Sequence, residues 1–107
     1  MNIRAIKGTD DILPEEISYW HNLEQKAREL FNCYGYSEIR TPIIEYTELF
    51  QRGVGQYTDI VQKEMYTFLD NKNRSITLRP EATASIVRSY IQHSMQVKNT
   101  LTKLFYI

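Results

Sequence analysis

The stretch Ile76-Thr77-Leu78-Arg79-Pro80-Glu81-Ala82-Thr83-Ala84 decides the fold, because an alternating, strand-like run passes through a proline into a helix. Pro80 suits the first turn of a helix, where its missing N–H would have no helical partner. Glu81 and Thr83 would then lie in that turn, beside unpaired backbone N–H groups and the positive end of the helix dipole. A carboxylate there is suited to grip an ammonium group. Equally, Glu81 could only stabilise the helix end, and this stretch alone favours neither reading.

A hairpin is predicted before this corner and a helix after it. Two β-prone runs, Met65–Leu69 and Ser75–Leu78, flank a polar loop. The helix is expected from Glu81 to about Met95, with one apolar side formed by Ala84, Val87, Tyr90 and Ile91. The run Leu101–Ile107 resembles the start of a buried strand, so we expect the chain to be cut from a longer protein.

The strongest periodic pattern predicts a long helix in the N-terminal third. Pro14 begins this helix and Gly35 ends it. Its apolar residues recur at steps of three or four, at Ile17, Trp20, Leu23, Ala27, Leu30, Phe31 and Tyr34. A strand over Tyr36–Arg40, an extended segment over Ile43–Tyr46 and a short helix around Thr47–Arg52 are expected next. The expected fold class is α+β, with the long helix and the second helix packed on a mostly antiparallel sheet in one domain.

The composition is that of an ordinary globular protein, with 107 residues, 42% hydrophobic, 24% charged and a formal net charge of zero. This charge gives no general indication of nucleic acid or membrane binding, although residues 71–107 carry six Lys and Arg against Glu81 alone. The single cysteine, Cys33, excludes an intrachain disulfide and is expected to be a small core residue in a reducing compartment. No apolar run reaches membrane-spanning length, and a cytoplasmic location without membrane contact is expected.

Four segments, in order and at matching spacing, resemble the histidyl-tRNA synthetase family. They are Lys7–Pro14 (KGTDDILP), Gly35–Glu45 (GYSEIRTPIIE), Arg52–Phe68 (RGVGQYTDIVQKEMYTF) and Leu78–Ala84 (LRPEATA). The second segment is similar to motif 1 of class II synthetases, which is their dimer-forming helix and strand. The chain departs from the family at Asp10, Gln56 and Ala82, where arginine, an acid and glycine are common. Leu104–Ile107 resembles the lead into motif 2, and motifs 2 and 3 are absent from the 107 residues.

The resemblance implies that residues 1–107 are the N-terminal part of a class II synthetase catalytic domain. The longer protein to which these residues would belong, the parent enzyme, would activate L-histidine with ATP and Mg²⁺ to histidyl-adenylate and pass the acyl group to tRNA(His). Glu81, Ala82 and Thr83 would bind the α-amino group of histidine, and Arg79 would support the loop. The parent would form a homodimer through the motif 1 region. The chain alone is expected to have no complete catalytic centre, no bound cofactor and no metal site, and so to be inactive.

Two alternatives stay open. One is the non-catalytic, synthetase-like regulatory subunit of ATP phosphoribosyltransferase, which shares the fold. The segment 52–68 and the Glu81-x-Thr83 pattern favour the synthetase over this paralogue. The other is a folded dimerisation module without turnover.

The remaining polar and aromatic residues have ordinary structural interpretations. His21 and His93 are expected at the surface of their helices. No zinc site is expected, because neither has an acidic or cysteine partner at metal-binding spacing. Trp20, Phe31 and Tyr34 are expected in the core or in a dimer contact. Arg88 and Lys98 are expected on a solvated surface, with contacts to tRNA as the alternative.

Overall fold

The computed structural model describes residues 2–52 and 64–107. Its elements, in chain order, are α1 (Ile17–Cys33), β1 (Ser37–Glu38), β2 (Ile44–Tyr46), α2 (Thr47–Arg52), β3 (Thr67–Leu69), β4 (Ser75–Leu78), α4 (Thr83–Gln92), α5 (Met95–Lys98) and β5 (Leu104–Phe105). This mixture of helices and strands confirms the α+β class. No helix within these ranges is both long and apolar enough to cross a membrane.

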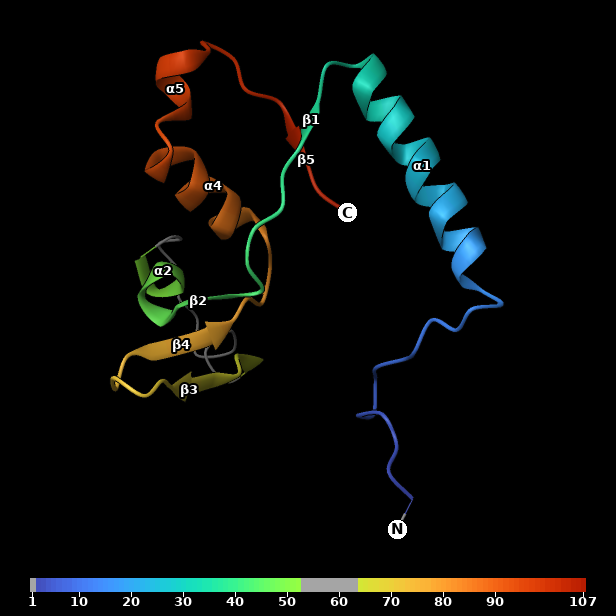
Figure 1. Cartoon of the computed structure of the whole chain (residues 1–107). Coiled ribbons are helices and arrows are strands. Elements are labelled where there is room, and N and C mark those ends of the chain that lie inside the picture. The colour runs from blue at the N-terminus through green and yellow to red at the C-terminus, as the bar shows by residue number, and fades with distance from the viewer. Residues whose placement is uncertain (1, 53–63) are drawn as a thin grey trace.

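An antiparallel sheet in the order β2-β4-β3 forms one half of the molecule (Figure 1). The predicted hairpin is confirmed, because β3 pairs with β4 in the register Thr67 to Thr77 and Leu69 to Ser75. Its turn is held by Asp70, whose Oδ1 accepts the backbone N–H groups of Lys72 and Arg74, each at 2.9 Å. Such a local side-chain acceptor explains how a long polar loop still fixes the hairpin.

The two faces of this sheet carry opposite chemistry. The face beneath α2 is polar: the fully buried hydroxyl of Thr77 bonds to Thr47 at 2.7 Å and to Thr67 at 2.9 Å, and Thr47 also bonds to Ser75 at 2.7 Å. The other face carries Ile44, Phe68 and Leu78, which are 43%, 48% and 40% exposed. Because successive side chains alternate between faces, Thr77 and Leu78 lie on opposite faces of the sheet.

A parallel pair of short strands, β1 and β5, joins the segment that follows α1 to the C-terminal segment of the chain. Ser37 is paired with Leu104 and Glu38 with Phe105. Phe105 is only 6% exposed and stacks on Phe31 of α1, with ring centroids 4.5 Å apart. Both strands are shorter than the expected Tyr36–Arg40 and Leu101–Ile107, and within the latter only Phe105 is buried.

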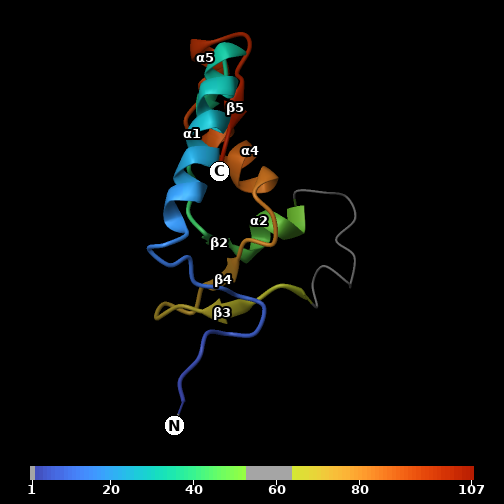
Figure 2. The same cartoon turned by 90° about the vertical axis from the view of Figure 1, so that its right-hand side faces the viewer.

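The long helix α1 lies beside the β1–β5 pair and away from the antiparallel sheet (Figures 1 and 2). Gly35 with φ +77° follows its end, as predicted. The expected packing on the sheet is wrong, because no residue of α1 is buried: Trp20 and Leu30 are 46% and 56% exposed. Cys33 is also exposed and is not a core residue. The radius of gyration, 17.5 Å, exceeds the roughly 13 Å of a compact domain of this length, which agrees with this open arrangement.

Helix α4 is shorter than predicted and shows a different face to the interior. It ends at Gln92, before Ser94 adopts a left-handed φ of 51°. Its buried residues are Ser85 and Ser89, whereas Val87 and Ile91 of the expected apolar side are 51% and 64% exposed. We attribute this orientation to size, since small serine side chains let α4 approach its neighbours closely.

An ion network of Arg28, Glu38 and Arg40, which Glu24 joins at 3.8 Å from Arg28, holds the C-terminal half of α1 against β1. Glu38 accepts from Arg28 Nε at 2.9 Å through Oε1 and from Arg40 Nε at 3.0 Å through Oε2. The hydrogen bond from Arg28, followed by that from Arg40, lowers the pKa of Glu38 below its ordinary value.

This network predicts an acid-sensitive contribution to stability. A carboxyl whose pKa is lower in the folded state stabilises the fold above its unfolded pKa, about 4.3 for Glu, and loses that effect as pH falls through the folded value. The gap in melting temperature between the unchanged chain and Glu38→Gln should therefore be largest near neutral pH and should narrow in acid. Thermal unfolding across this range measures it, and a gap independent of pH would contradict the role of the Glu38 charge.

Candidate functional site

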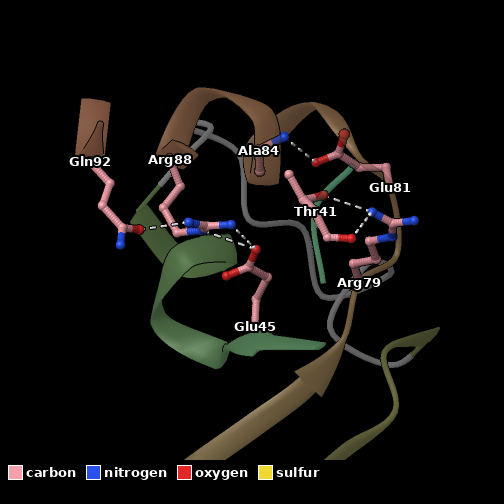
Figure 3. Close-up of polar contacts among 7 residues, drawn as sticks. All are labelled: Thr41, Glu45, Arg79, Glu81, Ala84, Arg88 and Gln92. Atoms are coloured by element: carbon pink, nitrogen blue, oxygen red, sulfur yellow. Dashed lines mark hydrogen bonds and ion pairs between the residues drawn. The ribbon is translucent and has the colours of Figure 1, made fainter. Parts of the chain in front are cut away.

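The corner between β4 and α4 presents the carboxylate of Glu81 at a helix N-terminus. Oε2 accepts the backbone N–H of Thr83 at 2.6 Å, and Oε1 accepts that of Ala84 at 3.1 Å (Figure 3 shows the second bond). The expected position of Pro80 and Glu81 in the first turn is wrong, because α4 begins at Thr83 with Ala82 as its N-cap. Glu81 instead caps the helix through its side chain, which satisfies N–H groups that have no helical acceptor.

These bonds leave acceptor capacity on Glu81. An ionised carboxylate offers about four lone-pair sites, and the two backbone bonds occupy one on each oxygen. Glu81 is exposed, Ala82 is half-buried and Thr83 is exposed at the first helical position. The three residues singled out from the sequence therefore lie together at one helix end, where a cation can approach a fixed carboxylate.

Arg79 fixes the strand side of the corner. Its backbone N–H donates to the Ile43 carbonyl at 2.9 Å, and its Nη1 donates to Thr41 Oγ1 at 2.9 Å. Figure 3 shows this guanidinium against Thr41, in the segment that leads into β2. The expected supporting role of Arg79 agrees with these contacts.

Arg88 fixes the helix side, through an ion pair with Glu45 of β2. Arg88 Nε and Nη2 lie 3.0 and 2.9 Å from Glu45 Oε1, and Arg88 Nη1 donates to Gln92 Oε1 at 2.7 Å (Figure 3). The side chain of Glu45 is 7% exposed and that of Arg88 is 27% exposed. The expectation that Arg88 lies on a solvated surface is therefore wrong, because a buried carboxylate requires a cation beside it.

The sequence contains a signal for this pair. Glu45 interrupts the apolar, strand-like run Ile43–Tyr46. When such a strand is covered, its acid needs a basic partner elsewhere in the chain. Sequence reasoning did not identify that partner, which is 43 residues away.

An open hollow of about 490 Å³ adjoins the pair, lined by Arg40, Thr41, Pro42, Glu45, Tyr46, Arg88, Ser89, Gln92 and His93. His21 and His93 are exposed, as predicted, and Lys98 is exposed as well. In residues 2–52 and 64–107, no group of three or more His, Cys, Asp or Glu could hold a metal ion. Most of the family-like segment 52–68, including Gln56, lies outside the described residues.

Comparison with known proteins gives one consistent result. The sequence profile of a family described as histidyl-tRNA synthetase matches residues 8–107. A protein named histidine–tRNA ligase from Moorella thermoacetica is 58% identical over 101 residues, covering 94% of this chain and 24% of that protein.

Two solved structures have the same fold as this chain. The apo histidyl-tRNA synthetase of S. aureus is 50% identical with a TM-score of 0.82, covering 98% of this chain and 24% of that one. A Bacillus halodurans protein described as an ATP phosphoribosyltransferase regulatory subunit/histidyl-tRNA synthetase is 29% identical with a TM-score of 0.78, covering 99% of this chain and 27% of that one. The chain thus spans about a quarter of the length of the proteins it matches.

Proposed function

Because the chain belongs to the histidyl-tRNA synthetase family, we propose that it forms the N-terminal part of the catalytic domain of a histidine–tRNA ligase. In this proposal it supplies the part of the amino-acid pocket that binds the α-amino group. The observation that carries the proposal is the exposed carboxylate of Glu81, fixed at the start of α4 by two backbone N–H groups. In this proposal, the parent enzyme is the longer protein that contains these residues.

Glu81 would bind the ammonium group of L-histidine through the lone pairs that the helix leaves unused. Thr83 would add its hydroxyl oxygen as a second acceptor, and Ala82 would line the backbone between them. A charge-assisted hydrogen bond is stronger and shorter than a neutral one, so this arrangement suits an amino acid in its zwitterionic form. The backbone N–H groups of Thr83 and Ala84 keep the carboxylate in one orientation before the substrate arrives.

The role of these residues is to bind and orient histidine. Activation joins the histidine carboxylate to the α-phosphate of ATP, with Mg²⁺ as part of the nucleotide substrate, and releases pyrophosphate. A hydroxyl of the terminal ribose of tRNA(His) then takes the acyl group, and AMP leaves. A fixed ammonium group leaves the substrate carboxylate in one place, which lowers the entropic part of the barrier. The groups that stabilise phosphoryl charge would come from other parts of the parent enzyme, which we propose acts in the cytoplasm.

A homodimer through the motif 1 region is the second part of the proposal. Helix α1 carries exposed apolar side chains at helical spacing, with Trp20, Leu23 and Leu30 at 46%, 62% and 56% exposure. An exposed apolar stripe of this kind is typical of an interface. A second copy is the occupant that the family resemblance implies, and sedimentation of the parent enzyme tests it.

The regulatory-subunit alternative has less support. The match to the Bacillus halodurans protein is 29% identical, against 58% for the Moorella thermoacetica protein named histidine–tRNA ligase. Glu81 and Thr83 also follow the synthetase pattern. A regulatory subunit would have no turnover with histidine and ATP.

Pyrophosphate exchange tests the proposed function. We expect the parent enzyme to exchange labelled pyrophosphate into ATP when histidine is added, and residues 1–107 alone to give no exchange, because Glu81 and Thr83 can position histidine but cannot bind the nucleotide. Other amino acids serve as the specificity control. Parent enzyme without histidine-dependent exchange would support the regulatory alternative, and product from the pure 107-residue chain would contradict its expected inactivity.

A further inference from the structure

We propose that Arg88 and Glu45 are positioning residues for the histidine site, since they hold α4, whose N-terminus carries that site. This inference rests on the proposed function and assigns a role to two residues that do not touch the substrate. It rests on the contacts that join both sides of the corner to one neighbouring segment, residues 41–45.

Both sides of the corner are tied to residues 41–45. On the strand side, Arg79 donates to Thr41 Oγ1 at 2.9 Å. On the helix side, Arg88 Nη2 lies 2.9 Å from Glu45 Oε1. Figure 3 shows the two guanidinium groups extending from either side of the corner to this segment. Glu81, Ala82 and Thr83 are thus held between two anchors on the same short stretch of chain.

The Arg88–Glu45 contact differs from an ordinary surface ion pair. The Glu45 side chain is 7% exposed, and two nitrogens of Arg88 converge on its Oε1 at 3.0 and 2.9 Å. A third nitrogen is fixed by Gln92 at 2.7 Å, one helical turn further along α4. Exposed pairs contribute little because their side chains move freely, whereas a buried pair with several bonds holds one geometry.

A helix transmits this constraint to the site. Arg88 lies on the second turn of α4, and the backbone N–H groups of Thr83 and Ala84 on the first turn hold the Glu81 carboxylate. If α4 rotates or shifts relative to β2, those N–H groups move and Glu81 moves with them. A displacement of about 1 Å in a positioned group can cost up to about a hundredfold in rate.

Steady-state pyrophosphate exchange with variants of the parent enzyme tests the inference. Arg88→Met removes the pair and keeps an unbranched side chain; we expect KM for histidine to rise about tenfold or more, with KM for ATP changed less than about twofold. Arg88→Lys keeps the charge but loses the converging bonds. Its KM for histidine should lie between that of Arg88→Met and that of the unchanged protein. Because KM does not depend on the fraction of folded enzyme, a poorly folding variant still gives an answer.

Arg74→Met is the matched control. Arg74 also forms an arginine–carboxylate pair, with Asp70 at 2.6 Å, but in the hairpin turn away from the corner. Arg74→Met should therefore leave KM for histidine unchanged. If the unchanged parent exchanges normally and Arg88→Met behaves like Arg74→Met, or raises both KM values equally, the positioning role is wrong while the proposed function stands. If the unchanged parent shows no histidine-dependent exchange, the proposed function itself fails.

Discussion

Replacing Glu81 by alanine in the parent enzyme is expected to lower kcat/KM for histidine in pyrophosphate exchange about a hundredfold. The carboxylate is the acceptor proposed for the histidine ammonium group, and a hydrogen bond to a charged group is worth about 1.5–3 kcal/mol. Because this contact forms when histidine binds and persists through the reaction, the change should fall mainly on KM. KM for ATP should change little.

The helix-capping role of Glu81 must be separated from its role in binding. Glu81 accepts the N–H groups of Thr83 and Ala84, and losing a capping acceptor costs about 1 kcal/mol of stability. Glu81→Gln keeps one side-chain oxygen for this purpose and loses the charge. If charge is what binds the ammonium group, Glu81→Gln should resemble Glu81→Ala in KM while melting closer to the unchanged protein. An unchanged exchange rate in Glu81→Ala would remove this residue from the pocket.

Replacing Phe105 by alanine is expected to loosen the half of the molecule that contains α1. Phe105 is 6% exposed and stacks on Phe31 at 4.5 Å, and truncating a buried phenylalanine costs about 3–5 kcal/mol. The β1–β5 pair has only two residues in each strand, so it offers little else to offset that loss.

Amide hydrogen exchange measures this effect at defined positions. The N–H of Ser37 donates to Lys103 at 3.0 Å and that of Ile39 to Phe105 at 2.9 Å. Both should exchange about a hundredfold faster in Phe105→Ala, since lowering the free energy of opening by about 3 kcal/mol raises the opening equilibrium constant by about that factor. Leu101→Ala is the matched control, because Leu101 is 71% exposed on the same segment. Equal protection in both variants would show that Phe105 does not hold this pair.

Local sequence chemistry predicted the parts of the fold that local interactions determine. The hairpin follows from two β-prone runs and from Asp70, whose carboxylate organises the turn within four residues. The end of α1 follows from Gly35 and its left-handed backbone. The proximity of Glu81 to the first N–H groups of the helix was likewise predictable, although its expected place inside the first turn was wrong, because this proximity depends only on Ala82, Thr83 and Ala84.

Features that depend on contacts between residues far apart in the sequence were not predictable in this way. Alternation identifies the two faces of β4 but does not say which one is covered, and here the covered residue is Thr77. The periodicity of α1 indicates an apolar stripe but not what lies against it. The pairing of Arg88 with Glu45 depends on where α4 lies relative to β2, which no local pattern encodes. The supporting residues of the candidate site therefore required the structure.

The hydroxyl-lined face of the antiparallel sheet has a thermodynamic consequence. Phe50 and Phe105 are the buried hydrophobic residues of the described ranges, and the buried polar residues there are more numerous, namely Glu45, Thr47, Thr77, Ser85 and Ser89. Newly exposed apolar surface raises the heat capacity of the unfolded state, and newly exposed polar surface lowers it. We therefore expect this part of the molecule to unfold with a small heat-capacity increment. Its stability curve is correspondingly flat, so cooling or moderate warming changes its free energy of unfolding less than it would in a domain with a large apolar core.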